Sequence, residues 1–407
     1  MKTDVVVIGG GAAGMLCAAT AAERGLSVTL LEPNKSLGKK LRITGKGRCN
    51  LTNNCEIAEV LRNIPGDGRF LQGALHRFSP ADTMAFFESL GVPLKTERGN
   101  RVFPASDSSH DIAEALYRYM RRGEVRVLHT GAKHILRDGE GEVRAVVTGE
   151  GELECRAAVI CTGGLSYPGT GSTGDGYRLA AELGHSVTPR RPSLVPLESS
   201  DPWCAEMQGF SLRNVELTAF EDDKPVYKAL GEMLFTHFGV SGPLVLSASA
   251  HMRDFAGKKY RLAIDLKPGL DEKKLDARIL RDFEKYNNKD FRNALGDLEG
   301  RMMIPVLVAL SGIPGETQVN SVTREQRREL VKLFKAFPVA VSGPRPIAEA
   351  IITSGGVSTR EIDPRTMSSK LVHGLYFAGE VLDLDAYTGG FNLQIAWSTG
   401  RLAGNSV

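Results

Sequence analysis

The sequence predicts an α/β protein with a Rossmann-like parallel sheet, and three features near the N-terminus support this prediction. The apolar run Val5–Ile8 predicts a buried parallel strand. Gly9, Gly11 and Gly14 follow in G-x-G-x-x-G spacing, where the chain turns into a helix. A second apolar segment then ends at Glu32. A strand, glycine-rich turn, helix, second strand and terminal acid in this order predict a dinucleotide site.

Each of these residues has a mechanical reason in such a site. Gly9 allows the tight turn, Gly11 lets the backbone approach a pyrophosphate, and Gly14 lets the helix pack on the strand. The carboxylate of Glu32 can accept hydrogen bonds from both ribose hydroxyls of an adenosine. It would repel a 2′-phosphate, so NADP is disfavoured in this position.

Composition excludes several classes of protein. The 407 residues are 42% hydrophobic with a formal charge of +3, which is too mild to predict nucleic-acid binding by itself. No apolar stretch reaches the roughly 18–20 residues of a membrane span and no secretory signal is visible, so we expect a cytoplasmic protein with no membrane partner. The six cysteines form no C-x-x-C pair and the eight histidines show no ligand spacing, so we expect free thiols and no metal.

The pattern along the chain predicts a discontinuous first domain with an insertion. Strands and helices alternate in residues 1–189 and again in 343–407, which we assign to one nucleotide-binding domain. Alternating apolar positions predict a β-rich inserted domain at 190–270 plus 314–342, with the form of an antiparallel sheet or small barrel. Helical spacing predicts a helical subdomain at 271–313.

Three glycine-rich segments follow predicted strands and should line one crevice, because ligands lie beyond the carboxyl ends of parallel strands. They are the first turn, Thr162-Gly163-Gly164, and residues 378–394. A lining of this extent suits a long ligand such as FAD. Gly389-Gly390 precedes a final helix whose free N–H groups could face the pyrimidine edge of an isoalloxazine. The alternative is a flexible loop ahead of a helix capped by Asn392.

In the predicted loop over residues 38–50, every charged residue is basic. It contains no acid, and its basic residues are Lys39, Lys40, Arg42, Lys46 and Arg48. A solvated loop is one interpretation, but the small and polar residues between the cations favour contact with a pyrophosphate or an anionic substrate.

Several motifs resemble one known family across essentially the whole chain. They lie at residues 38–53, 163–176, 231–243, 353–358 and 379–394. In these the sequence resembles the HI0933-like flavoproteins, also called the BaiN or YhiN family, within the two-dinucleotide-fold flavoprotein group. The resemblance implies a Rossmann-like FAD-binding domain with an inserted β-barrel-like subdomain and a helical subdomain. The predicted cofactor contacts are Gly9, Gly11, Ala12, Ala13, Gly14, Glu32, Lys40, Arg42, Thr44, Gly45, Arg48, Cys49, Asn50, Ala132, Thr162, Gly163, Gly379, Glu380, Gly390, Phe391 and Asn392.

The family implies an oxidoreductase with tightly bound FAD, and leaves the substrate open. Our leading expectation is reduction of a conjugated C=C bond, as in a 3-oxo-Δ4 bile-acid or steroid-like enone, with NAD(P)H as a transient reductant. The alternatives are dihydrouridine synthesis in 23S rRNA, oxidation of aminoacetone or another amine by dioxygen, and a non-enzymatic redox-sensing role. Expected partners are therefore a small enone-like substrate or rRNA.

Four side chains are candidate proton donors near the substrate. They are His237, Ser241, Tyr167 and Tyr387. His237 and Ser241 belong to the one motif of the insertion, which favours a role towards substrate. Packing of a domain joint is an equally good interpretation of His237.

Overall fold

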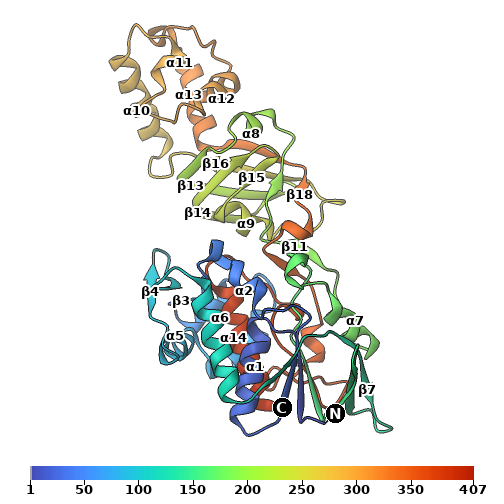
Figure 1. The fold of residues 1–407 in the computed structure, drawn as a ribbon. Helices are drawn as coiled ribbons and strands as arrows, with labels where there is room; N and C mark the ends of the chain where they lie inside the picture. Colours follow the sequence, from blue (N-terminus) through green and yellow to red (C-terminus); the bar gives the residue numbers. More distant parts are fainter. Residues whose placement is uncertain (1) are drawn as a thin grey trace. The chain divides into compact units, whose positions relative to one another are not determined.

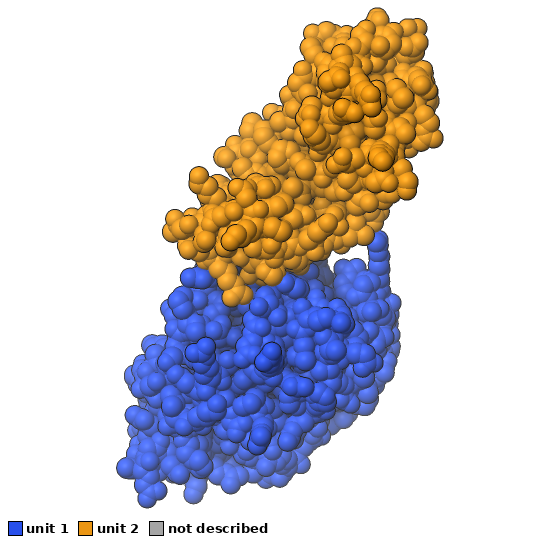
Figure 2. Space-filling view, turned by 180° about the vertical axis from the view of Figure 1, so that it is seen from behind, with its two compact units in different colours: residues 1–193, 346–407 blue, residues 194–345 orange. Residues whose placement is uncertain are grey.

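The computed structural model describes residues 2–407 and contains two compact units (Figure 2). The first comprises residues 1–193 and 346–407, and the second comprises residues 194–345. Each unit has its own hydrophobic core. The sequence predicts an insertion from residue 190 to residue 342, and the second unit spans residues 194–345.

A five-stranded parallel sheet forms the centre of the first unit. Its order is β20-β10-β1-β2-β6, and every neighbouring pair is parallel. The strands are β1 (Val5–Ile8), β2 (Val28–Leu31), β6 (Arg126–Leu128), β10 (Ala157–Ile160) and β20 (Leu375–Phe377). All residues of β1, β2 and β10 are buried, which explains why β1 and β10 are continuous apolar runs and why Thr29 is the one polar residue of β2.

Three helices pack side by side over this sheet (Figure 1). They are α1 (Ala12–Glu23), α6 (Ser109–Arg122) and α14 (Phe391–Ser406). The backbones of α1 and α14 approach closely, because a Cβ on Gly400 or Gly404 would lie 2.5 or 2.6 Å from a carbonyl oxygen of α1. The C-terminal helix is therefore fixed against the helix that follows the glycine-rich turn.

Smaller elements complete the first unit. Two antiparallel sheets comprise β7 (Ala132–Arg137), β8 (Val143–Thr148) and β9 (Gly151–Glu154), and β3 (Thr52–Asn53), β5 (Arg101–Pro104) and β4 (Leu94–Glu97). A two-stranded ribbon joins β11 (Arg191–Ser193) to β19 (Ile352–Ser354). The other helices are α2 (Lys39–Ile43), α3 (Ile57–Arg62), α4 (Gln72–Arg77), α5 (Pro80–Ser89) and α7 (Asp175–Glu182). Helix α2 and a 3₁₀ turn (Thr44–Gly47) lie within the segment that the sequence predicted as a loop.

The second unit contains a seven-stranded antiparallel sheet, in the order β17-β16-β13-β14-β15-β12-β18. Its strands are β12 (Leu197–Glu198), β13 (Ser211–Glu221), β14 (Lys224–Thr236), β15 (Gly239–Ser241), β16 (Tyr260–Asp265), β17 (Phe337–Val341) and β18 (Gly343–Pro344). Helices α8 (Pro202–Glu206) and α9 (Pro243–Ser249) accompany it. The two longest strands, β13 and β14, pair along most of their length.

Four further helices belong to the second unit: α10 (Glu272–Lys285), α11 (Phe291–Ala294), α12 (Ile304–Ser311) and α13 (Arg324–Lys335). Helix α13 lies in the range 314–342 that the sequence assigned to the β-rich part. A capping box between Thr323 and Gln326 begins it, and Leu330 and Phe334 are buried in the core. It packs against α10 and α12, so the helical region extends beyond residue 313.

Candidate functional site

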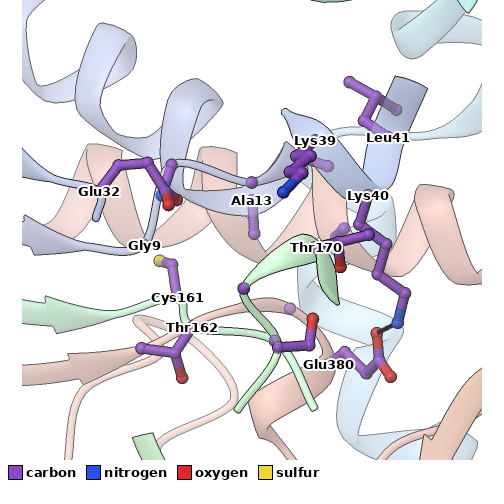
Figure 3. Close-up of a pocket in the computed structure, with 18 of the residues that line it drawn as sticks. Gly9, Ala13, Glu32, Lys39, Lys40, Leu41, Cys161, Thr162, Thr170 and Glu380 are labelled. Carbon is purple, nitrogen blue, oxygen red and sulfur yellow. Dashed lines mark hydrogen bonds and ion pairs between the residues drawn. The ribbon is translucent and has the colours of Figure 1, made fainter. Parts of the chain in front are cut away.

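One pocket of the first unit lies at the carboxyl ends of its parallel strands (Figure 3). Its walls come from the turn after β1, the end of β2, the turn after β10, the residues after β20 and the first turns of α14. The structure thus brings the three glycine-rich segments of the sequence to one place. Every residue that lines this pocket belongs to the first unit.

Thirteen of the predicted cofactor contacts line this pocket. They are Gly9, Gly11, Ala12, Ala13, Glu32, Lys40, Thr44, Ala132, Thr162, Gly163, Gly379, Glu380 and Asn392. The other eight are not among its lining residues: Gly14, Arg42, Gly45, Arg48, Cys49, Asn50, Gly390 and Phe391. Their contact with a cofactor stays a prediction.

The turn into α1 has the form that a bound diphosphate requires. A Cβ on Gly14 would lie 1.9 Å from the carbonyl oxygen of Gly9, so only glycine permits this packing. Gly11 is the N-cap residue of α1, and no side chain caps the first turn. A Cβ on Gly11 would meet no protein atom within 4 Å. The free N–H groups and the positive end of the helix dipole therefore border open space in the pocket.

The carboxylate of Glu32 is held in a fixed orientation on the pocket wall. Its Oε2 accepts a hydrogen bond from the Gly10 N–H (2.9 Å), and its Oε1 accepts two from Asn34, from the backbone N–H (2.9 Å) and from Nδ2 (2.7 Å). The Asn34 Nδ2 also donates to the carbonyl of Thr170 at 3.1 Å. Because Oε2 accepts only one of these bonds, it keeps a lone pair for a ribose hydroxyl.

Thr162 lines the pocket, but its hydroxyl is turned away from it. The Oγ1 atom is buried and has no partner among residues 2–407. It occupies the space beside Gly176, where a Cβ would lie 2.0 Å from it. A cofactor contact from Thr162 would therefore come from its backbone or its methyl group.

Lys40 and Glu380 form an ion pair in the pocket wall, marked by a dashed line in Figure 3. The Lys40 Nζ donates to Glu380 Oε2 and to Ser166 Oγ, both at 2.7 Å. The other oxygen, Oε1, accepts from the Thr353 N–H (2.9 Å) and the Ser166 hydroxyl (3.2 Å). The side chains of the pair are only 22% and 15% exposed, so solvent screens them weakly.

The first turn of α14 also lacks a side-chain cap. Its N-cap residue is Gly390, with φ +98°, and a Cβ there would lie 2.4 Å from the carbonyl oxygen of Thr52. The alternative in which Asn392 caps this helix is wrong, because the helix begins before it. The Asn392 side chain instead accepts from the Ala386 N–H (2.9 Å) and donates to the Ala386 carbonyl (2.7 Å). The N–H groups of the first turn therefore have no side-chain acceptor. They remain available to an electron-rich ring edge of a cofactor.

The two predicted arginine contacts pair with acids of their own unit. The Arg42 Nη2 lies 3.0 Å from Glu114 Oε1. Arg48 forms ion pairs with Glu97 and with Asp107, and the hydrogen bond that its guanidinium donates to Glu97 is the main cause that raises the pKa of Arg48. Carboxylates of the same unit therefore already compensate the positive charge of both guanidinium groups.

Cys49 is fully buried in a left-handed backbone conformation, with φ +59°. Burial raises the pKa of its thiol to about 12, so the sulfur stays protonated at neutral pH. Its neighbour Asn50 lies beside the start of α14, where its amide oxygen can accept from the Gly390 N–H at 3.0 Å.

None of the four predicted proton donors is among the residues that line the pocket. His237 and Ser241 belong to the second unit, and Tyr167 and Tyr387 belong to the first. Tyr167 is 37% exposed with φ +52°. The Tyr387 N–H donates to the carbonyl of Asn63 at 2.9 Å. Their catalytic roles stay predictions.

Sequence reasoning missed several residues of the pocket. Ile351 and Ile352 line it, whereas the motif recognised in the sequence begins only at the next residue, Thr353. Asn34, Ser166 and Thr353 hold the carboxylates of the wall in place. These hydrogen bonds join segments that lie far apart in the chain, so no local sequence pattern predicts them.

The described part of the chain, residues 2–407, contains neither a cluster of metal ligands nor a helix suited to a membrane. No group of three or more His, Cys, Asp and Glu residues there could hold a metal ion. No helix in the same range combines the length and hydropathy needed to cross a membrane.

The parallel sheet, the uncapped glycine turn and the fixed acid define a Rossmann-type FAD-binding protein. The family model described as HI0933-like protein Rossmann domain matches residues 3–406, so the chain belongs to the HI0933-like family. It is an FAD-dependent oxidoreductase.

Relatives and solved structures agree with this family. The chain is 30% identical to a 3-dehydro-bile acid delta(4,6)-reductase of Clostridium scindens, over 98% of each chain. It is also 30% identical to a ribosomal RNA dihydrouridine synthase of Escherichia coli, over 98% of this chain and 96% of that protein. Its fold is similar to that of a 3-ketosteroid delta1-dehydrogenase from Sterolibacterium denitrificans, with a TM-score of 0.54, 14% identity and 99% of each chain covered.

Proposed function

We propose that this enzyme reduces a C=C bond conjugated to a carbonyl group, with electrons from NAD(P)H. The observation that carries the proposal is the chemistry common to relatives of equal identity. The Clostridium scindens protein is named for reduction at positions 4 and 6 of a 3-dehydro (3-oxo) bile acid. Dihydrouridine differs from uridine by reduction of the C5=C6 bond, which is conjugated to the C4 carbonyl. Both products arise by adding a hydride and a proton across an activated double bond.

The residues of the pocket have defined tasks in such a reaction. The first turn of α1 would hold the pyrophosphate of FAD, and Glu32 would accept from its ribose. When bound and reduced by NAD(P)H, FAD would supply the hydride. Lys40 offsets the negative charge of Glu380, so the wall does not oppose charge on a reduced cofactor. The uncapped start of α14 would stabilise that charge further.

The reductant and the proton donor complete the proposal. NAD(P)H visits only transiently, because the site at α1 is taken by FAD and Glu32 disfavours a 2′-phosphate there. His237, Ser241, Tyr167 and Tyr387 stay the candidate donors to the second carbon.

The first substrate class is a small 3-oxo enone of steroid type. Uridine in the large-subunit rRNA is a second candidate, favoured by two relatives: the Escherichia coli protein, and a Haemophilus influenzae protein of the same name that is 30% identical over the whole of this chain. A uridine would have to leave its stack to present its base to the site.

Anaerobic spectroscopy of the holoenzyme tests the reaction class. NADH or NADPH should bleach the flavin, and adding a 3-oxo-Δ4 enone should restore the oxidised spectrum, whereas the saturated 3-oxo analogue should not. Rapid peroxide formation from aminoacetone, with no reoxidation by an enone or by uridine-containing rRNA, would contradict the proposal. For the second substrate class, 23S rRNA from a strain lacking the gene is analysed for dihydrouridine by mass spectrometry. An unchanged content would remove rRNA as the substrate.

A further inference from the structure

Helix α10 of the second unit carries four cations along one side. Lys274, Arg278, Arg281 and Lys285 follow at intervals of four, three and four residues. At about 100° per residue, all four fall within an arc of about 60°. With a rise of about 1.5 Å per residue they form a stripe about 16 Å long. We call these four residues the α10 stripe.

A hollow in the surface lies against the first part of this stripe. It is lined by Leu270, Lys274, Ala277, Arg278 and Arg281. Three of these side chains are cationic, two are apolar and none is acidic. A concave site of this composition can bind an anionic group through its three cations. A flat or weakly polar part of the same ligand can contact its two apolar side chains.

The cations of the stripe differ in how far their charge is already compensated. Lys285 lies 2.7 Å from Asp297, and Arg278 lies 2.9 Å from Asp282, whose side chain is only 8% exposed. Lys274 is 71% exposed, and its contact with the exposed Asp271 is long, at 3.7 Å.

Arg281 is exposed, and its side chain forms no ion pair or hydrogen bond with another described residue of the chain, 2–407. Lys274 and Arg281, on the rim of the hollow, are therefore the cations most available to a ligand.

We propose that the α10 stripe is a docking surface for the sugar-phosphate backbone of a folded RNA. The inference rests on the proposed function, in which uridine of rRNA is one of the two substrate classes. A nucleic-acid strand places a phosphate about every 3.4 Å along a helix axis, so a stripe of about 16 Å spans roughly five nucleotides. Phosphate contacts of this kind position a protein on its nucleic acid without reading sequence.

The surface fits RNA better than a lipid membrane. A membrane-binding helix needs a wide apolar face beside its cations. The one large apolar side chain exposed on α10 is Leu280, at 41%. At about 100° per residue it lies at least about 100° around the helix from every cation of the stripe.

Salt-dependent RNA binding tests the proposal. The test variant is Lys274→Gln with Arg281→Gln, which leaves the pairs of Arg278 and Lys285 intact. The control is Lys273→Gln with Lys332→Gln, which makes the same change in net charge at exposed lysines outside the stripe. The probe is protein-free 23S rRNA from an Escherichia coli strain that lacks its own dihydrouridine synthase, titrated against each holoenzyme at several KCl concentrations.

We expect the slope of log K against log salt to become shallower by about 2 in the test variant, one for each lost phosphate contact. The control should keep the wild-type slope. An unchanged slope in the test variant, or an equal change in the control, would overturn the proposal. So would tighter wild-type binding to polyglutamate or to phosphatidylserine vesicles than to rRNA.

Two further measurements separate this proposal from the proposed function. FAD content and anaerobic reoxidation by an enone or by the same 23S rRNA, measured on the same preparations, report on the reaction. If the wild type binds no FAD, or is reoxidised by neither substrate, the proposed reaction is wrong. If they are normal in all variants and only the salt slope fails to change, the docking surface is wrong. Thermal melting verifies folding, and Arg281→Gln alone replaces the double variant if that variant does not fold.

Discussion

Replacing Gly11 by glutamate should abolish FAD binding while leaving the fold intact. The structure separates these two effects. Gly11 has φ −83° and ψ −168°, which any residue adopts, and a Cβ there meets no protein atom within 4 Å. The new side chain would therefore enter the pocket at the end of α1 without displacing the chain.

The expected loss can be worked from charge alone. A carboxylate about 5 Å from a single phosphate charge interacts with about 3 kcal/mol at an effective dielectric constant of 20, so a diphosphate of two charges gives about 6–7 kcal/mol. Since about 1.4 kcal/mol is a factor of ten, FAD affinity should fall by more than about 10⁴. Screening that halves the energy would still leave a loss of more than about 100-fold.

The assay compares Gly11→Glu with two other variants, by flavin absorbance after purification and by thermal melting of the apoprotein. Gly11→Ala adds only the Cβ and should keep FAD. Gly14→Ala, whose Cβ would lie 1.9 Å from the Gly9 carbonyl oxygen, should lose about 3 kcal/mol or more of stability. Gly11→Glu should melt within about 3 °C of Gly11→Ala. A Gly11→Glu protein that retains one FAD per chain would refute this account of the turn.

Three further predictions follow from the same unit. Lys40→Met leaves the shielded Glu380 without its cation and should cost about 2 kcal/mol of stability and speed FAD release in stopped-flow dilution, whereas Lys40→Arg should not; equal release rates would contradict a role of the charge. Gly390→Ala should destabilise the fold by about 2–3 kcal/mol in urea titrations, because its φ is +98° and its Cβ would lie 2.4 Å from a carbonyl oxygen; a wild-type midpoint would show that the turn relaxes freely. Burial, opposed by Glu361, lowers the pKa of His185, so the unfolded chain binds its proton first and stability should fall as the pH drops below about 6.5. That acid limb should be absent in His185→Gln, measured by melting temperature against pH, and its persistence would assign it to other groups.

Local patterns predicted the parts of the fold that local physics determines. The run Val5–Ile8 is buried on both faces of a parallel sheet, so it has to be apolar throughout. Gly14 is required by a contact with Gly9, only five residues away, and the motif therefore records it. Helix α13 begins with its own capping box, Thr323 to Gln326, yet the surrounding alternation of apolar residues hid it in the sequence.

Contacts between distant segments could not be predicted in this way. Lys40 and Glu380 were both expected to touch the cofactor, but their pairing joins residues 340 positions apart. Asparagine is a common N-cap residue, but the Asn392 side chain instead forms hydrogen bonds with the backbone of Ala386. Each of these residues could be placed near the site from the sequence, because the strand or helix beside it could be predicted. The residue that each side chain contacts could not be predicted, because that depends on how the whole unit packs.

The division of the chain makes cofactor binding and the proposed docking of RNA separable by experiment. All residues that line the pocket belong to the unit of residues 1–193 and 346–407, and the hydrophobic cores of the two units share no residue. An exposed substitution on α10 therefore changes no packing or hydrogen bond around Glu32 or the turn of α1. Relatives that are equally identical to this chain carry names for a steroid and for an RNA substrate, which is expected if the pocket holds the common cofactor and other residues select what is reduced. For the same reason, if the α10 stripe docks RNA as proposed, a Gly11→Glu protein without flavin should still bind RNA through Lys274 and Arg281, with a wild-type salt slope.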